Sequence, residues 1–266
     1  MIIARFKPLS ETDIASSACS DQDSFWGLVE GDTILELKSP PFEGIEPGKA
    51  SYSLSEVTML APVCPSKVVA IGWNYLGHIK ELGNTIPSEP LIFLIAPSAV
   101  VGHGAPIILP PESEKVDFEG ELAIVIGKKC RRIKREKASE VIFGYTALND
   151  VTARDLQRKD GQFSRAKSFD TFCPTGPWIQ TELDAANVQV TTRVNGELRQ
   201  DDNTRTMLFD PYYLVEYVSA AMTLHAGDII ATGTPSGVGA LSSGDEVTIT
   251  VEGIGDLTNV VTLEEF

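Results

Sequence analysis

Short apolar segments recur along most of the chain, and turn-forming residues separate them. Segments rich in Val, Ile and Leu that are too short for helices and are bounded by Gly, Asp, Asn or Pro are typical of buried strands. The sequence therefore predicts strands at 68–71, 91–95, 119–126, 143–148, 188–194, 228–231, 247–251 and 257–262. Because so many strand segments must join into sheets, we expect a mainly β fold (α+β) with peripheral helices.

Local signals refine this prediction at two places. Asn195–Gly196 suits the positive φ angles of a type I′ hairpin turn. Asp210 is a good N-cap and Pro211 a good first residue for a helix at 211–222. Shorter helices are expected at 74–82 and 152–159.

The chain divides into two regions. Residues 1–60 contain the short apolar runs IIARF, SFWGLVEG and TILEL, followed by a polar stretch rich in Pro, Gly and Ser at 39–55. From LAPVCPSKVVAIGWNY onward a second series of strand signals begins. We therefore expect a small β-rich N-terminal domain at 1–60 and a larger domain at 61–266.

Charge and hydropathy exclude several classes of partner. The 266 residues carry a formal net charge of −15, with a pI near 4.6. A nucleic-acid-binding face needs clustered positive charge, so we expect no nucleic-acid partner, and we interpret the basic run at 128–136 as a solvated connector. No apolar run reaches the length of about 18–20 residues that spans a bilayer, so no membrane partner is expected either.

The start of the sequence and its cysteines favour a cytoplasmic protein. MIIARFKPLS lacks the long apolar core and the cleavage site of a secretory signal. The cysteines show neither CxxC nor CxxH spacing, which argues against a zinc knuckle and a disulfide scaffold. We expect four reduced thiols, at Cys19, Cys64, Cys130 and Cys173.

Acidic side chains begin the apolar segment VDFEGELAIVIGK. The period of two in a strand places Asp117, Glu119 and Glu121 on one face, with alternate residues about 6.5–7 Å apart. Unpaired buried carboxylates are costly, so a cation between Glu119 and Glu121 would justify the arrangement. The alternative is that the pair lies on a sheet face exposed to water.

Asp150, in GYTALNDVTARD, is the best third ligand because it ends an apolar strand. Its alternative role is the N-cap of the helix at 152–159. Neither Cys nor His accompanies Glu119, Glu121 and Asp150, and an all-oxygen set suits Mg²⁺, Mn²⁺ or Ca²⁺ better than zinc. Mg²⁺ would keep some of its waters there and so leave positions for a chelating substrate.

Three further features could act beside such a metal. His78 has Glu81 three residues later on the same helical face, which would suit a general base and its orienting carboxylate, or an exposed salt bridge. Lys167 could bind a substrate carboxylate, although most lysines simply lie on the surface. The loop at 229–239 could present the Gly233 backbone N–H and the Thr234 hydroxyl to an anion.

Taken together, seven segments resemble the fumarylacetoacetate hydrolase (FAH) family, and they occur in the family's order. They are IGWNYLGHIKELG, VDFEGELAIVIGK, GYTALNDVTARDLQ, AKSFDTFCPTGPW, VNGELRQ, TMLF and AGDIIATGTPSGVG. The resemblance covers about 66–262, and residues 1–60 resemble the small N-terminal domain of bacterial members. It implies rolled mixed β-sheets and a homodimer.

The resemblance also implies a site and a substrate class. Mg²⁺ or Mn²⁺ would be held by Glu119, Glu121 and Asp150, while Asp117 is not a ligand. The substrate would be a small 2-oxo acid or acylpyruvate that chelates the metal. His78 with Glu81 would deprotonate water or the substrate, and the substrate or its developing charge would be held by Lys167 and Thr234.

One position departs from the family's pattern. Relatives commonly read Phe-Leu-Lys where this chain reads Phe93-Leu94-Ile95, so a cationic pocket residue is expected to be lost at Ile95. The leading hypothesis is hydrolysis of a C–C bond in an acylpyruvate. The first alternative is tautomerisation of a 2-hydroxymuconate-type acid, or decarboxylation of a 2-oxo diacid, at the same site. The second is a non-catalytic protein that binds a metal or a ligand.

Overall fold

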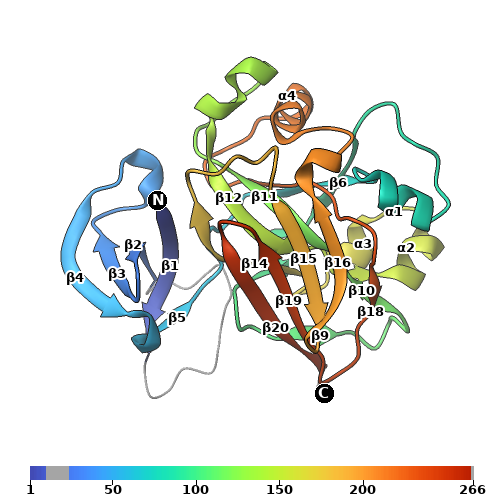
Figure 1. Ribbon diagram of the computed structural model, residues 1–266, viewed down its shortest axis with the longest axis horizontal. Helices are drawn as coiled ribbons and strands as arrows, with labels where there is room; N and C mark the ends of the chain where they lie inside the picture. Colours follow the sequence, from blue (N-terminus) through green and yellow to red (C-terminus); the bar gives the residue numbers. More distant parts are fainter. Residues whose placement is uncertain (10–23, 265–266) are drawn as a thin grey trace.

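The computed structural model describes residues 1–9 and 24–264, and strands dominate these residues (Figure 1). Cys19 lies outside the described residues. The largest sheet of the described part is 12-stranded. Ten of its strands follow one hydrogen-bonded path, in the order β4(Pro47–Ser53), β3(Thr33–Leu37), β2(Phe25–Glu30), β1(Ile2–Pro8), β14(Cys173–Gln180), β12(Ile142–Asn149), β11(Gly120–Ile126), β17(Ile229–Ala231), β6(Val68–Gly72) and β7(Leu91–Ile95). Beside this path, β5(Val57–Met59) pairs with β1, and β8(Val100–Val101) pairs with β14.

Two smaller sheets complete the described architecture. A 3-stranded sheet has the order β13(Thr152–Ala153), β10(Val116–Phe118) and β18(Gly239–Ala240). A 5-stranded sheet, which packs against β11, β12 and β14, has the order β16(Glu197–Asn203), β15(Gln189–Val194), β19(Glu246–Val251), β20(Gly255–Leu263) and β9(Ile107–Leu109). The pairs β6–β17, β8–β14 and β9–β20 are parallel and most others are antiparallel, so the predicted mixed β architecture is confirmed.

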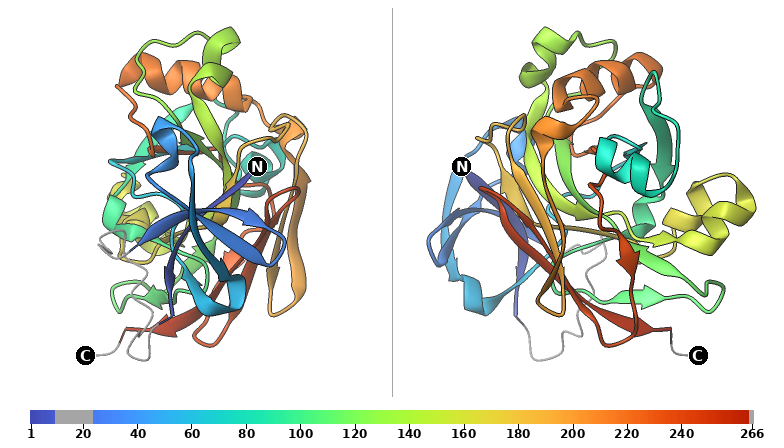
Figure 2. Two further views of the ribbon diagram at one scale, coloured as in Figure 1. Left: turned by 90° about the vertical axis from the view of Figure 1, so that its left-hand side faces the viewer. Right: turned by 45° about the vertical axis from the view of Figure 1, so that its right-hand side comes forward.

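The helices lie outside the sheets, as Figures 1 and 2 show, with α1, α2 and α3 on one side of the molecule. The α-helices are α1(Leu76–Glu81), α2(Arg154–Asp160), α3(Ser164–Lys167) and α4(Pro211–Ala221). The 3₁₀ helices are η1(Pro41–Glu43), η2(Leu54–Glu56), η3(Pro97–Ala99), η4(Arg135–Glu140) and η5(Thr204–Thr206). The helix predicted at 152–159 starts later because Thr152 and Ala153 pair with β10. α3 is too short to produce a helical repeat in the sequence.

Two local predictions are confirmed. Asn195 and Gly196 have φ angles of 52° and 79° and connect β15 to β16 as a hairpin. The Asp210 side chain accepts hydrogen bonds from the backbone N–H groups of Tyr212 and Tyr213 and so caps α4. In both cases the local residues indicate the backbone conformation that the structure has.

The N-terminal strands β1–β5 gather at the left of Figure 1. They also extend the largest sheet, because Ile2 and Ile3 of β1 pair with β14. The polar stretch at 39–55, where the sequence indicates no strand, contains β4. Its mostly exposed residues show no apolar alternation because β4 lies at the edge of the sheet and pairs with β3 alone. The domain boundary near residue 60 stays a prediction.

The basic run at 128–136 is tied to α4. The Arg131 guanidinium donates to the carbonyls of Ser219 and Ala220, in the last turn of that helix, where a cation is favourable. Arg135 forms an ion pair with Asp210 at the other end of the helix. A role in holding α4 therefore accounts for this charge. In the described part of the chain, no helix is both long and apolar enough to cross a membrane.

β11 is the strand that carries the candidate site, and it is buried along its whole length. It pairs with β12 on one edge and with β17 on the other. Leu122 and Ile124 pack into one apolar cluster, while Ala123 and Val125 pack into another on the opposite face. Side chains at its first residues therefore start from a backbone that is fixed on both edges and both faces.

Candidate metal centre

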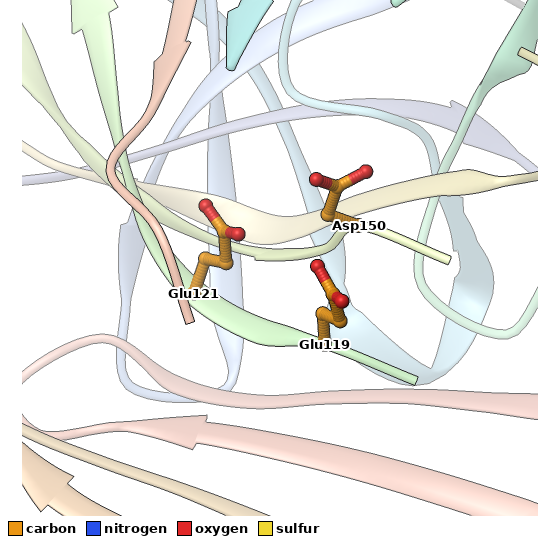
Figure 3. Close-up of side chains that lie close together, drawn as sticks. All are labelled: Glu119, Glu121 and Asp150. Atoms are coloured by element: carbon orange, nitrogen blue, oxygen red, sulfur yellow. The ribbon is translucent and has the colours of Figure 1, made fainter. Parts of the chain in front are cut away.

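Three carboxylates converge at the start of β11, as Figure 3 shows. Glu119, Glu121 and Asp150 each present one oxygen atom, and these atoms lie within 4.8 Å of one another. The residues are 4%, 2% and 1% exposed. The alternative that the glutamates lie on a water-exposed sheet face is therefore wrong.

Strand geometry explains how residues 29 or more positions apart meet here. Glu119 and Glu121 share a face because they are two residues apart. β11 and β12 pair antiparallel with Gly120 opposite Asn149, so Asp150 falls opposite Glu119, and the Asp150 N–H donates to the Glu119 carbonyl at 2.9 Å. Asp150 does not cap the following helix, because the N-cap of α2 is Ala153, so that alternative is also wrong.

Two buried cations contact the acids. The Lys167 ammonium donates to Glu119 at 2.7 Å and to Asp150 at 2.6 Å. The Arg154 guanidinium donates to the other oxygen of Glu119 and, at 2.9 Å, to Asp117. All of these residues are at most 4% exposed. Lys167, predicted to face the substrate, therefore lies among the acids, and Asp117 joins the cluster only through Arg154.

Charge counting shows what this cluster lacks. With Glu121 included, four buried carboxylates face two buried cations, so the fully ionised cluster carries two negative charges. Buried charge is strongly unfavourable unless it is neutralised. One divalent cation would neutralise the cluster. The residues therefore fit a divalent ion held by Glu119, Glu121 and Asp150.

The pKa values of the acids reflect the same imbalance. Burial alone would raise the pKa of Glu119, but the Lys167 and Arg154 cations lower it to about 2. Burial raises the pKa of Asp150 to about 6, although Lys167 opposes the shift. Burial, together with repulsion from Asp150, raises the pKa of Glu121 well above its usual value. Without a metal, protons therefore compensate for part of the excess negative charge.

Buried polar atoms without a hydrogen-bond partner also indicate that the cluster lacks a cation. In the described part of the chain, Asp150 Oδ1, Asp117 Oδ1 and Asn149 Nδ2 are buried and make no hydrogen bond. Such atoms cost about 1–3 kcal/mol each unless water or an ion satisfies them. All of the candidate ligand atoms are carboxylate oxygens, which suits Mg²⁺, Mn²⁺ or Ca²⁺.

The His78–Glu81 pair lies at the same pocket. His78 Nδ1 is 3.3 Å from Glu81 Oε2, and Glu81 also accepts the Gly237 N–H at 3.0 Å. His78 is 4% exposed and lines the pocket with the three acids. The alternative of an exposed helical salt bridge is therefore wrong for His78. The carboxylate can instead fix the orientation of a buried imidazole.

The loop after β17 closes another side of the pocket. The Gly233 N–H donates to Glu121 at 2.7 Å. The Thr234 hydroxyl lines the pocket, but it donates to the Gly120 carbonyl and accepts from Gln200. Both groups therefore hold the start of β11, and their predicted contact with the substrate stays a prediction.

Glycine is required at position 233. Its φ is +98°, and an added Cβ would lie 2.8 Å from Cβ of Asn74. The Asn74 side chain in turn donates to the Thr232 and Phe209 carbonyls. A left-handed backbone with this little space accepts only glycine.

Sequence reasoning missed Arg154 and Gln200. Gln200 is fully buried, and its side-chain amide bonds Gly120, Thr192, Thr234 and the Pro235 carbonyl, so it joins β16 to the loop and to β11. Both residues lie within the segments that carry the family resemblance, GYTALNDVTARDLQ and VNGELRQ. Their place in those segments is the one signal that could have indicated them.

Position 95 contributes no side chain to the pocket. Ile95 is 1% exposed and packs in the core with Val68 and Ala70. Phe93, two residues earlier, lines the pocket, and the Lys167 ammonium lies 5.1 Å from the centre of its ring. We expected Ile95 to remove a cation from the pocket, but the side chain at this position does not line the pocket.

Comparison with known proteins identifies the family. A model for the C-terminal domain of fumarylacetoacetate (FAA) hydrolase matches residues 67–262, and an Rv2993c-like N-terminal model matches residues 14–62. The first match covers most of the larger region. The mixed β-sheets and the buried acids agree with it. The chain belongs to the fumarylacetoacetate hydrolase family.

Similar proteins have related but distinct activities. The chain is 47% identical to the oxaloacetate tautomerase YisK of Bacillus subtilis over 231 aligned residues. The alignment covers 81% of this chain and 77% of that protein. A 5-carboxymethyl-2-hydroxymuconate delta-isomerase from Mycobacterium smegmatis superposes with a TM-score of 0.89 at 45% identity, over 99% of this chain and 100% of that one.

A third relative was solved with a metal. Maleylpyruvate hydrolase from Sphingobium sp. SYK-6, in complex with manganese(II) and pyruvate, superposes with a TM-score of 0.78 at 32% identity, over 100% of both chains. Isomerases, tautomerases and hydrolases therefore share this fold.

Proposed function

We propose that this chain is a divalent-metal-dependent tautomerase of small 2-oxo acids, which interconverts their keto and enol forms. The observation that carries the proposal is the buried cluster of three candidate ligand carboxylates, which with Asp117 lacks two positive charges, beside the His78–Glu81 pair in one pocket. The similarity to an oxaloacetate tautomerase and to a delta-isomerase favours this reaction over the C–C hydrolysis that the motifs first suggested.

The three acids and the histidine would divide the chemistry between them. Glu119, Glu121 and Asp150 would hold the ion, which supplies Lewis-acid stabilisation of negative charge developing on the substrate oxygens. His78 donates its Nδ1–H to Glu81, which leaves Nε2 free to take a proton from the carbon next to the keto group. The proton then moves to the 2-oxo oxygen, so no bond between heavy atoms breaks and no water is consumed.

Lys167 would assist next to the acids. Its ammonium already bridges Glu119 and Asp150, and the carboxylates raise its pKa although burial alone would lower it. It therefore remains a cation next to the ion site and can stabilise the enolate form of the substrate.

The test is a keto–enol assay with oxaloacetate. We expect the protein loaded with Mg²⁺ or Mn²⁺ to speed the change in ultraviolet absorbance, and we expect EDTA to abolish this effect. Glu119→Ala should lose the activity while keeping its fold, as judged by circular dichroism. An undiminished rate in Glu119→Ala, or in EDTA, would refute the proposal.

A second candidate is hydrolysis, which the fit to maleylpyruvate hydrolase favours. His78 would then activate a water molecule that attacks a carbonyl further along the substrate. An acylpyruvate assay separates the reactions, because hydrolysis releases free pyruvate whereas tautomerisation yields no second product. Decarboxylation of oxaloacetate would release CO₂ together with pyruvate.

A further inference from the structure

The pocket at the acids is too small for a whole substrate. Its free volume is about 20 Å³, which is room for about one water molecule. An ion and the chelating end of a 2-oxo acid could occupy this space only with movement of side chains such as Lys167. The remainder of the substrate must extend into a neighbouring hollow.

Two hollows adjoin the pocket, and Trp73 and Phe163 line both of them. One has a volume of about 290 Å³ and is otherwise lined mainly by apolar groups, Leu91, Ile92 and Phe93. The other has a volume of about 220 Å³ and is the more polar of the two, with a lining that includes Asn84, Arg154, Gln157 and Arg158. The two hollows therefore offer different chemistry to the distal end of a substrate.

Arg158 is the cation of the polar hollow that remains available. Arg154 is already engaged by Asp117 and Glu119. Arg158 follows it by four residues on α2, hence on the same helical face and about 6 Å further along the axis. Within the described ranges 1–9 and 24–264, no carboxylate lies within ion-pair distance of Arg158.

The wall between the hollows carries an independent sign of a functional site. Trp73 has a φ of 57°, a left-handed conformation that is rare for residues other than Gly, Asn and Asp. Such strain concentrates at ligand sites. Trp73 also packs edge-on near Phe163, with 6.4 Å between ring centres, so both aromatic rings are fixed at the junction of the three cavities.

We propose that Arg158 binds the distal carboxylate of the substrate, so that this chain is selective for 2-oxo diacids. The inference rests on the proposed function, whose ion site would bind the 2-oxo acid end. The pocket at the acids and the hollow that contains Arg158 share Trp73, Phe163 and Arg154 in their linings, so a substrate that extends from the ion site into this hollow brings its distal end toward Arg158. Arg158 would also supply the cation that the side chain at position 95, which faces the core, does not supply. An arginine can bind a carboxylate through two parallel hydrogen bonds.

Arg158→Ala tests the proposal when two substrates are compared. Losing a charge-assisted hydrogen bond should raise KM about 10- to 100-fold for oxaloacetate, a diacid. It should change KM far less for acetopyruvate, which lacks the distal carboxylate. Arg158→Lys should recover part of the loss. Lys159→Ala, at the next and exposed position of α2, is the matched control and should behave like the wild type.

Binding provides a second readout that does not depend on turnover. Calorimetry on the manganese-loaded proteins should show weaker oxaloacetate binding in Arg158→Ala and unchanged binding of oxalate, which is too short to reach Arg158. Equal effects on both ligands, or no effect on oxaloacetate, would overturn the proposal. If the wild type turns over neither acid, the proposed function fails, and the two dissociation constants for oxaloacetate still decide the role of Arg158.

Discussion

Replacing Lys167 by Met tests two consequences of its position between Glu119 and Asp150. The ammonium stabilises the metal-free protein, and it competes with a metal ion for these carboxylates. Met keeps the length and the apolar stem of the side chain but removes the ammonium. The residue is 2% exposed, and its ammonium is 2.7 Å from Glu119 and 2.6 Å from Asp150. Without a metal, the variant is left with four buried carboxylates and a single buried cation, Arg154.

The expected loss of stability is large. Removing one partner of a buried ion pair costs about 3–5 kcal/mol. For a chain of this size, about 2–4 °C of Tm is lost per kcal/mol, so the metal-free variant should melt about 6–20 °C below the wild type. The loss should be larger at pH 8 than at pH 5, because protonation of the acids relieves their repulsion at the lower pH.

A divalent metal should reverse much of this loss. The wild-type ammonium contacts two of the three candidate ligand carboxylates, whereas the variant has no such competitor and carries one more negative charge. At 100 times its Kd, an ion stabilises the folded protein by about 2.7 kcal/mol. Calorimetry should therefore show tighter Mn²⁺ binding to Lys167→Met than to the wild type, although its activity should fall.

Differential scanning fluorimetry in EDTA and in Mn²⁺ is the assay. Lys159→Met, at an exposed position of α2, is the control and should melt with the wild type in both buffers. The reasoning would be refuted if Lys167→Met matched the wild-type Tm in EDTA at pH 8. Weaker Mn²⁺ binding by the variant would equally contradict it.

The other predictions test the groups around this centre. Asp117→Asn should weaken Mn²⁺ binding about 10- to 100-fold, because Asp117 holds the Arg154 guanidinium that contacts the ligand Glu119. Calorimetry measures this affinity, and an equal loss of affinity in the exposed Asp160→Asn variant would contradict the prediction. Mn²⁺ affinity should rise from pH 5 to pH 7.5, since the pKa of Asp150 is raised to about 6 and the ion must displace its proton; a flat profile would argue against this ligand. In the metal-free protein the same raised pKa contributes stability that is fully present below about pH 4 and is lost as the pH rises through about 6, which urea titrations across this range would measure. Glu81→Gln should lower kcat, because the imidazole loses the carboxylate that fixes its orientation; an unchanged kcat would mean that another group is the base.

The acids could be predicted because their geometry is local. The period of two fixes Glu119 and Glu121 on one face whatever the rest of the chain does. Asp150 could be suggested from its place at the end of an apolar strand. Its position opposite Glu119 needed the register of β11 and β12, which no short stretch of sequence contains.

The cations could not be placed in the same way. Arg154 reaches Glu119 because β13 pairs with β10, and that pairing brings together segments more than 30 residues apart. The charge balance became visible only once burial was known, since the same six side chains on a surface would each be solvated. β4 escaped prediction for the opposite reason, because an exposed edge strand needs no apolar alternation.

The burial of the acids and the exposure of Arg158 have a consequence for how such proteins diverge. The chemistry depends on core positions, where most substitutions lower the stability of the fold. The proposed choice of substrate depends on side chains such as Asn84 and Arg158, which reach solvent. Substitutions at exposed positions usually change stability by less than about 0.5 kcal/mol. A duplicated copy of this gene could therefore acquire a new substrate through a few surface substitutions, while inheriting the reaction centre unchanged.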